Sequence, residues 1–190
     1  MKNKVIIGLL SIITATTLAA CNAEEASKVP NTKETEVNHE MNHSSMNHSS
    51  SGEIPDGLQE AKNPTYPVGA KATLKANHME GMDGAEATIV GAFDTTVYEV
   101  TYTPTTGGEP VENHKWVIHQ ELENPGAAPL EVGAEVALRA DHMEGMKGAT
   151  ATIDSAEKTT VYMVDYTDTL TGKDVTNHKW VVESELSPVE

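Results

Sequence analysis

The sequence predicts an all-β protein built from two tandem copies of one small unit, and two observations support this. Residues 69–122 align with residues 133–186 at a constant offset of 64 without gaps, and 32 of the 54 aligned positions are identical. Apolar and polar residues alternate along short stretches bounded by glycine and proline, the pattern of half-buried strands. No stretch shows a sustained helical period. We therefore expect one β unit over residues 57–122, a second over residues 123–190, and little helix.

Each unit is expected to contain four clear strands and a glycine-rich turn. In the first unit the turn is marked by Gly81 and Gly84, and a hairpin loop is marked by Gly107 and Gly108. The expected strands of the first unit are residues 68–76, 85–90, 95–103 and 111–119. The expected strands of the second unit are residues 136–140, 149–153, 159–167 and 177–182.

The glycines and apolar positions of residues 133–153 read Gly-x-x-Val-x-Leu-x-Ala-Asp-His-Met-x-Gly-Met-Lys-Gly-Ala-x-Ala-Thr-Ile. This pattern resembles the strand–turn–strand signature of KOW-type, SH3-like barrels. The resemblance implies two tandem small SH3-like barrels, each with five strands. The connector over residues 123–129 contains Pro125 and Pro129, so we expect a stiff link and a fixed pair of units.

The N-terminal residues have the features of a secretory signal. Lys2 and Lys4 precede a short apolar run, and residues 18–21 read Leu-Ala-Ala-Cys, which resembles the lipobox of bacterial lipoproteins. The resemblance implies removal of residues 1–20 and lipidation of Cys21. The alternative is an ordinary signal peptide with an incidental cysteine. Cys21 is the sole cysteine of the chain, so lipidation would leave methionine as the only soft metal ligand.

Residues 21–56 are polar and lack the apolar side chains that a core needs, so we expect a disordered tether. Within this tether Met-Asn-His-Ser-Ser occurs twice, and such His-rich segments are typical of metal binding. A thioether favours Cu(I), whereas an imidazole also accepts Cu(II), zinc or nickel. The alternative is a low-complexity linker without a ligand. The candidate ligands of the tether are His39, Met41, His43, Met46 and His48.

The pentapeptide His-Met-Glu-Gly-Met is identical in the two copies of the repeat, at residues 78–82 and 142–146. It supplies one imidazole and two thioethers per copy, a donor set that suits Cu(I). The alternative is that the methionines fill one end of a small barrel, as methionine does well, while the histidine caps the turn. The candidate ligands of the two pentapeptides are His78, Met79, Met82, His142, Met143 and Met146.

A second repeated motif is Asn-His-Lys-Trp, at residues 113–116 and 177–180. The spacing of two on a strand places His114 with Trp116, and His178 with Trp180, on one face. In the simpler interpretation the tryptophan is a core residue and the histidine is structural. In the other, each histidine is a further ligand and the indole covers the bound cation. His119 is a weaker candidate, because Glu183 occupies the aligned position.

The chain carries no catalytic motif of the kinds that would indicate an enzyme. Its formal net charge of −16 argues against nucleic-acid binding. The lipobox, the Met/His tether and the duplicated motifs together resemble the YdhK-type (DUF1541) lipoproteins of Gram-positive bacteria, and among them the copper-binding CopL type. The resemblance implies binding of copper, with Cu(I) preferred and Cu(II) accepted, and a contribution to copper tolerance.

The resemblance also implies a location on the outer face of the cell membrane, reached through the lipid alone, and action beside a copper exporter. We expect a monomer. Two other hypotheses stay open from the sequence. One is a cell-envelope interaction module that binds wall polymer or a protein, with structural methionines and histidines. The other is a copper chaperone that serves a specific acceptor.

Overall fold

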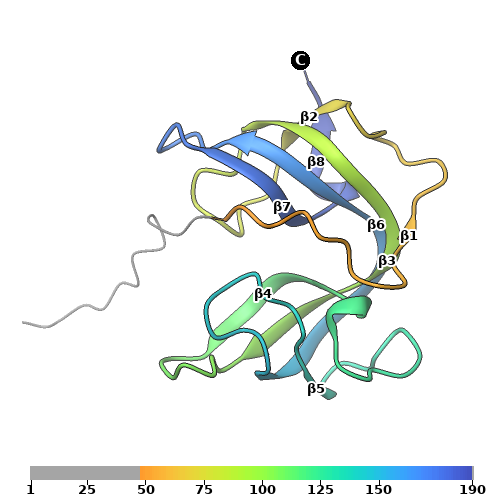
Figure 1. Ribbon diagram of the computed structural model, residues 1–190, viewed down its shortest axis with the longest axis vertical. Coiled ribbons are helices and arrows are strands. Elements are labelled where there is room, and N and C mark those ends of the chain that lie inside the picture. The colour runs from red at the N-terminus through yellow and green to blue at the C-terminus, as the bar shows by residue number, and fades with distance from the viewer. Residues whose placement is uncertain (1–47, 190) are drawn as a thin grey trace, which may run out of the picture. The chain divides into compact units, whose positions relative to one another are not determined.

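The computed structural model describes residues 48–189, and within this range the all-β class is confirmed (Figure 1). Two short 3-10 helices, η2 (His119–Glu121) and η3 (Glu183–Glu185), are the only helical elements of the described chain. All the strands join one antiparallel sheet. They are β1 (Gln59–Glu60), β2 (Lys71–Leu74), β3 (Glu86–Tyr102), β4 (Val111–Ile118), β5 (Glu135–Ala137), β6 (Thr150–Thr167), β7 (Asp174–Val182) and β8 (Leu186–Pro188).

The two longest strands, β3 and β6, each run through a region where the sequence predicts two separate strands. That part of the prediction is wrong, because Gly91 marks a bulge rather than the end of a strand. The register between β3 and β6 shifts between Ile89 and Gly91, and then pairing continues. A Cβ atom at Gly91 would lie 2.6 Å from the ring of Phe93, so glycine lets that ring fold back over the strand.

The two repeats exchange strands along the pairing of β3 with β6. This antiparallel pairing extends from Ala87 opposite Tyr166 to Tyr102 opposite Ala151. The first half of β3 therefore lies beside the second half of β6, with β2 on one side and β7 on the other. The second half of β3 lies beside the first half of β6, between β4 and β5. Figure 1 shows β3 and β6 passing through both groups of strands.

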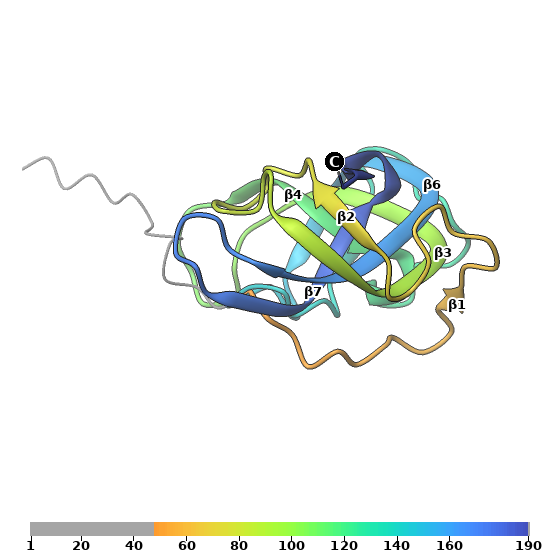
Figure 2. The ribbon, with the colours of Figure 1, turned by 90° about the horizontal axis from the view of Figure 1, so that it is seen from above.

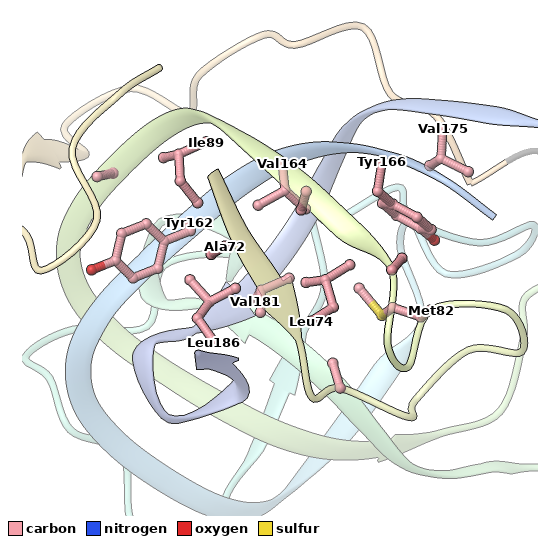
Figure 3. Close-up of a cluster of buried hydrophobic side chains, with 14 residues drawn as sticks. Ala72, Leu74, Met82, Ile89, Tyr162, Val164, Tyr166, Val175, Val181 and Leu186 are labelled. Carbon is pink, nitrogen blue, oxygen red and sulfur yellow. The ribbon is translucent and has the colours of Figure 1, made fainter. Parts of the chain in front are cut away.

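Each apolar cluster consequently contains residues of both repeats. One cluster combines Leu74 and Ile89 with Tyr162 and Val164, as Figure 3 shows. A second cluster combines the second half of β3 with β5 and the first half of β6. The described strands do not divide into one barrel for each repeat, so the SH3-like assignment is not confirmed. The internal duplication is nevertheless visible, because the strands of the two repeats follow in the same order.

The duplication also extends to the way in which each half of the sheet is completed. After β7 the chain turns through η3, and Leu186 of β8 pairs with Leu74 of β2. After β4 it turns through η2, and Leu122 forms a bridge with Leu138. These two pairs are related by the offset of 64, so η2 and η3 occupy equivalent places.

The last residues of the expected tether are part of the fold. Ser50 donates its backbone N–H to the carbonyl of Thr176 at 3.0 Å, beside β7. The prediction of disorder up to residue 56 is therefore wrong for residues 48–53, because backbone and serine groups of this segment hydrogen bond to β7. Within the described chain no helix has the length and apolar character needed to cross a membrane.

Candidate metal centre

The pentapeptide turns lie between β2 and β3 and between β5 and β6, as the sequence predicts. Gly81 adopts a φ of 76°, which favours glycine. The side chain of Asp168, in the hairpin loop of the other repeat, occupies the place where a Cβ would lie. The backbone N–H of Thr169 in that loop donates to the carbonyl of Gly81 at 2.9 Å. Each pentapeptide is thus held by a loop of the opposite repeat, since Thr105 bonds Gly145 in the same way.

The histidines of the second motif are oriented by a kink in β4 and in β7. Asn113 and Asn177, which precede them, have φ angles of 54° and 53°, in the left-handed region that asparagine tolerates better than most residues. The register shifts on both sides of the pairs Val100–His114 and Val164–His178. These bulges explain why asparagine stands before each histidine, and they turn the imidazoles toward the pentapeptides.

The imidazoles form two pairs, and each pair contains one histidine from the first repeat and one from the second. The ring centroids of His78 and His178 are 6.3 Å apart with an interplanar angle of 34°. Those of His142 and His114 are 6.0 Å apart with an angle of 38°. The strand histidine therefore faces the pentapeptide of the other repeat. We name these clusters the His78 site (His78, His178 and Glu185) and the His142 site (His142, His114 and Glu121).

A glutamate completes each site, buried in the case of Glu121 and half-buried in the case of Glu185, and neither was predicted from the sequence. Glu121 accepts a hydrogen bond from His142 Nε2 at 2.9 Å, and Glu185 Oε1 lies 3.3 Å from His78 Nε2. The second oxygen of Glu121 accepts from Trp180 Nε1 at 3.0 Å and from the backbone N–H of Ile118 at 3.2 Å. The repeat contained a signal for them: Glu121 aligns with Glu185, although the two residues before each glutamate differ between the copies.

Glu185 has the same set of donors as Glu121. Its Oε2 accepts from Trp116 Nε1 at 3.0 Å and from the backbone N–H of Val182 at 3.1 Å. Both tryptophans lie in a third apolar cluster, with Phe93 and Val161. Their indole N–H groups point to the carboxylates, so the tryptophans hold the glutamates in place. The predicted role of the two indoles as a cover for a bound cation stays a prediction.

The two strand histidines have strongly lowered pKa values. Burial, with smaller contributions from the charges of His142 and His78, lowers the pKa of His114 to about 3. Burial likewise lowers the pKa of His178 to about 3, with His78 adding to the effect. Burial raises the pKa of the Glu121 carboxyl, but the charge of His142 and the hydrogen bonds outweigh it and leave that pKa below its usual value. At neutral pH both strand histidines therefore carry a free lone pair.

Each site presents imidazole nitrogens that are buried without a hydrogen-bond partner among the described residues. They are Nδ1 of His142 and Nε2 of His114 in one site, and both nitrogens of His78 with Nε2 of His178 in the other. A buried polar atom without a partner costs free energy and calls for an explanation. With a metal–nitrogen bond of about 2 Å, two imidazoles that share an ion have ring centres up to roughly 6 Å apart. The centroid separations of 6.0 and 6.3 Å lie at the upper end of this range.

The four pentapeptide methionines divide into two kinds. Met82 and Met146 are fully buried, each within an apolar cluster, and Figure 3 shows Met82 beside Leu74 and Tyr166. Met143 is half-buried, and its sulfur accepts a hydrogen bond from Tyr102 at 3.8 Å. Met79 is half-buried against the first cluster. Among the described pentapeptide methionines, Met79 and Met143 are thus the two that are not enclosed in a cluster, and each directly follows the pentapeptide histidine of its site.

The remaining candidate ligands differ in whether the structure describes them and in what they contact. Cys21, the expected signal segment and the candidate tether ligands His39, Met41, His43 and Met46 lie outside the described residues. His48 lies beside His178, and the backbone of His48 is hydrogen bonded to the His178 ring. His119 contacts Tyr98 and the carbonyl of Gly126 through its two ring nitrogens. Among residues 48–189, no three side chains of His, Cys, Asp or Glu are arranged around one metal position.

Comparison with known proteins places the chain in a family. The family model described as "Protein of unknown function (DUF1541)" matches residues 68–119 and 132–183, one match per repeat. The uncharacterized protein YdhK of Bacillus subtilis is 52% identical over 187 residues, which cover 97% of this chain and 89% of that protein.

Solved structures of the Bacillus subtilis YdhK protein are similar to this chain. A 2.00 Å crystal structure is 59% identical, with a TM-score of 0.74, and covers 77% of this chain and 100% of the solved one. A solution NMR structure of its C-terminal domain is 60% identical, with a TM-score of 0.62, and covers 64% and 92% of the two chains. With two family matches that coincide with the two repeats and a relative similar along nearly its whole length, this chain belongs to the DUF1541 family.

Proposed function

We propose that the protein binds copper outside the cell, with Cu(I) preferred, at the His78 and His142 sites. The observation that carries the proposal is that both histidines of each site present a buried ring nitrogen with no hydrogen-bond partner among the described residues. A bound ion would satisfy those nitrogens. Imidazole with a neighbouring thioether from Met79 or Met143 is a donor set that favours Cu(I) and also accepts Cu(II).

The carboxylate of Glu121 supports this proposal by the way it contacts His142. An ionised carboxylate only accepts hydrogen bonds, so Nε2 of His142 carries the proton that it donates to Glu121. Nδ1 is then the nitrogen left for a metal. Carboxylates that hold the second nitrogen of a ligating histidine are a regular feature of metal sites and raise the basicity of the ligand.

The low pKa values of the strand histidines support it as well. A metal competes with a proton for the same lone pair. His114 and His178, with pKa values of about 3, present that lone pair without a proton throughout the neutral range. Binding at these two nitrogens therefore costs no proton release near neutral pH.

We also propose that the protein is a lipoprotein, anchored at Cys21 on the outer face of the membrane, which lowers free copper beside an exporter. The motif that ends at Cys21 and the resemblance to copper-binding lipoproteins support this part. Replacement of Cys21 by alanine is expected to move the protein from the membrane fraction into the medium. A variant that stays in the membrane fraction would contradict the lipid anchor.

The copper proposal is tested by titrating the mature protein with Cu(I) against a colorimetric chelator. The parent is expected to compete for two ions at the folded sites, and His78→Asn and His142→Asn are each expected to remove one of them. His119→Asn is the matched control, because both nitrogens of His119 are already bonded. If the parent cannot compete, or if the control loses as much as the two variants, copper binding at these sites is refuted. An envelope interaction module would then be the better hypothesis.

A further inference from the structure

Two buried tyrosines lie against the strand histidines of the two sites. Tyr102 is the last residue of β3, and Tyr166 is the last but one of β6. The strands β3 and β6 run side by side in Figure 1 and Figure 2 and are antiparallel, so the tyrosines lie at opposite ends of this pair. The ring centroids of Tyr102 and His114 are 5.9 Å apart at 88°, and those of Tyr166 and His178 are 5.8 Å apart at 86°. Each tyrosine therefore packs edge-on against one histidine of a site.

The hydroxyl of Tyr102 contacts a second candidate ligand of the same site. It donates to the sulfur of Met143 at 3.8 Å, and Met143 directly follows His142 in the chain. The ring of Tyr102 thus contacts the strand histidine while its hydroxyl contacts the pentapeptide thioether. A thioether sulfur has two lone pairs, so a hydrogen bond to one of them leaves the other for a metal. The bond therefore restrains a flexible side chain without removing it as a ligand.

The hydroxyl of Tyr166 is the equivalent group of the His78 site. Tyr166 is 4% exposed, and its hydroxyl is buried without a hydrogen-bond partner among the described residues. A buried hydroxyl in this state costs free energy. The offset of 64 that relates Tyr102 to Tyr166 also relates Met79 to Met143, and Met79 packs against the apolar cluster that contains Tyr166. A hydrogen bond to the sulfur of Met79 would satisfy this hydroxyl.

We propose that Tyr102 and Tyr166 are positioning residues that hold the thioethers of Met143 and Met79 as copper ligands. This inference rests on the proposed copper binding and names the groups that fix the soft donor of each site. The preference for Cu(I) depends on that donor, because imidazoles alone also accept other ions. A methionine side chain that is not restrained has to be ordered by the ion itself, at a cost in affinity. The hydroxyls reduce this cost.

Tyr102→Phe tests the role of the hydroxyl, because it keeps the ring that packs against His114. Cu(I) affinity of the His142 site is expected to fall about 2- to 10-fold, the effect of one neutral hydrogen bond. Tyr98→Phe is the matched control. Tyr98 lies on β3 in the same apolar cluster as Tyr102, but its hydroxyl contacts His119. This control is expected to leave the affinity unchanged, and a loss equal to that of Tyr102→Phe would contradict the proposal.

A double-mutant cycle with Met143→Leu separates positioning of the thioether from packing. The full mature chain carries His78→Asn, so that the His142 site is the folded site read by chelator competition with Cu(I). Tyr102→Phe is expected to weaken binding when Met143 is present and to have no effect when leucine replaces it. Equal losses in both backgrounds would show that the hydroxyl acts without the thioether, and the inference would be wrong.

The same cycle applies to the His78 site in the His142→Asn background. Tyr166→Phe is expected to weaken Cu(I) binding there about 2- to 10-fold, and to have no effect once Met79→Leu has removed the sulfur. Tyr162→Phe is the control, because the hydroxyl of Tyr162 donates to Glu183. An unchanged affinity in Tyr166→Phe would overturn the proposal for this site.

Methyl NMR of the metal-free protein gives a readout that does not depend on copper. The methyl group of Met143 is expected to report one side-chain rotamer in the parent and an average of several in Tyr102→Phe, with no change in Tyr98→Phe. Averaging already in the parent would show that the hydroxyl does not hold the thioether. If the parent does not compete for Cu(I) at all, the proposed function fails, and the role of the tyrosines toward copper fails with it.

Discussion

Glu121→Gln tests how the His142 site is held, because the substitution keeps the shape of the side chain and changes only its hydrogen bonding. One oxygen of Glu121 accepts from both Trp180 and the backbone of Ile118, and the other accepts from His142. A carboxamide has one oxygen and one NH₂ group. The oxygen satisfies two donors on the tryptophan side, so the NH₂ group is expected to face His142.

The expected consequence is a change of tautomer at His142. An NH₂ group that faces Nε2 requires that nitrogen to accept, which moves the ring proton to Nδ1, the nitrogen left for a metal. Affinity for Cu(I) at this site is expected to fall about 10- to 100-fold, or about 1.4–2.8 kcal/mol. The protein is also expected to lose about 1.5–3 kcal/mol of unfolding free energy, because Glu121 is 6% exposed and its hydrogen bonds involve a charged acceptor.

The assay is a chelator competition with Cu(I) in the His78→Asn background, so that only the His142 site is read. Nitrogen-detected NMR of His142 follows the proton, and urea unfolding follows stability. Glu123→Gln is the matched control, since Glu123 is exposed two residues along the chain. An affinity within twofold of the parent, together with a His142 proton that stays on Nε2, would refute the role assigned to Glu121.

Three further results are expected. Since the pKa values of His114 and His178 are lowered to about 3, their unfolded forms bind protons first as pH falls below about 6.5. Unfolding free energy is thus expected to drop by about 2 kcal/mol per histidine between pH 7 and pH 5; urea midpoints that do not change would contradict this. Met82→Leu and Met146→Leu are expected to leave copper affinity unchanged and to lower the unfolding free energy by less than about 1.5 kcal/mol each. Met79→Leu and Met143→Leu are instead expected to weaken Cu(I) binding in the same titration. Trp180→Phe is expected to cost about 1–3 kcal/mol in urea unfolding, because it leaves a buried carboxylate oxygen short of a donor; a stability equal to that of the parent would show that the bond is unimportant.

Local features of the fold were predictable from the sequence, whereas the exchange between the repeats was not. Alternation along residues 95–103 and 159–167 and the glycines of the pentapeptide indicated strands and turns that the structure contains. Periodicity has no information about which strand lies beside which. An offset of 64 is equally compatible with two separate units and with strands shared along β3 and β6. Only the pairing of Ala87 with Tyr166 and its continuation distinguish the two.

In the candidate site, too, the individual residues were predictable and their partners were not. His78 and His178 were both predicted as candidates from their motifs, but their partnership across repeats depends on the exchange of strands. Glu121 and Glu185 were not predicted because glutamate is common at surfaces, and periodicity does not indicate that each of the two accepts a hydrogen bond from a tryptophan. The identity of the two glutamates between copies, next to positions that differ, was the available signal.

The exchange of strands gives a physical reason why both copies keep their motifs. The His78 site takes His78 from the first repeat and His178 and Glu185 from the second, while Trp116 of the first repeat holds that glutamate. The His142 site reverses these origins. A change at either copy therefore damages a site that the other copy needs, so neither repeat can lose its motif and leave one intact unit behind. Two separate barrels would place no such constraint on the sequence, because each would hold a complete site of its own.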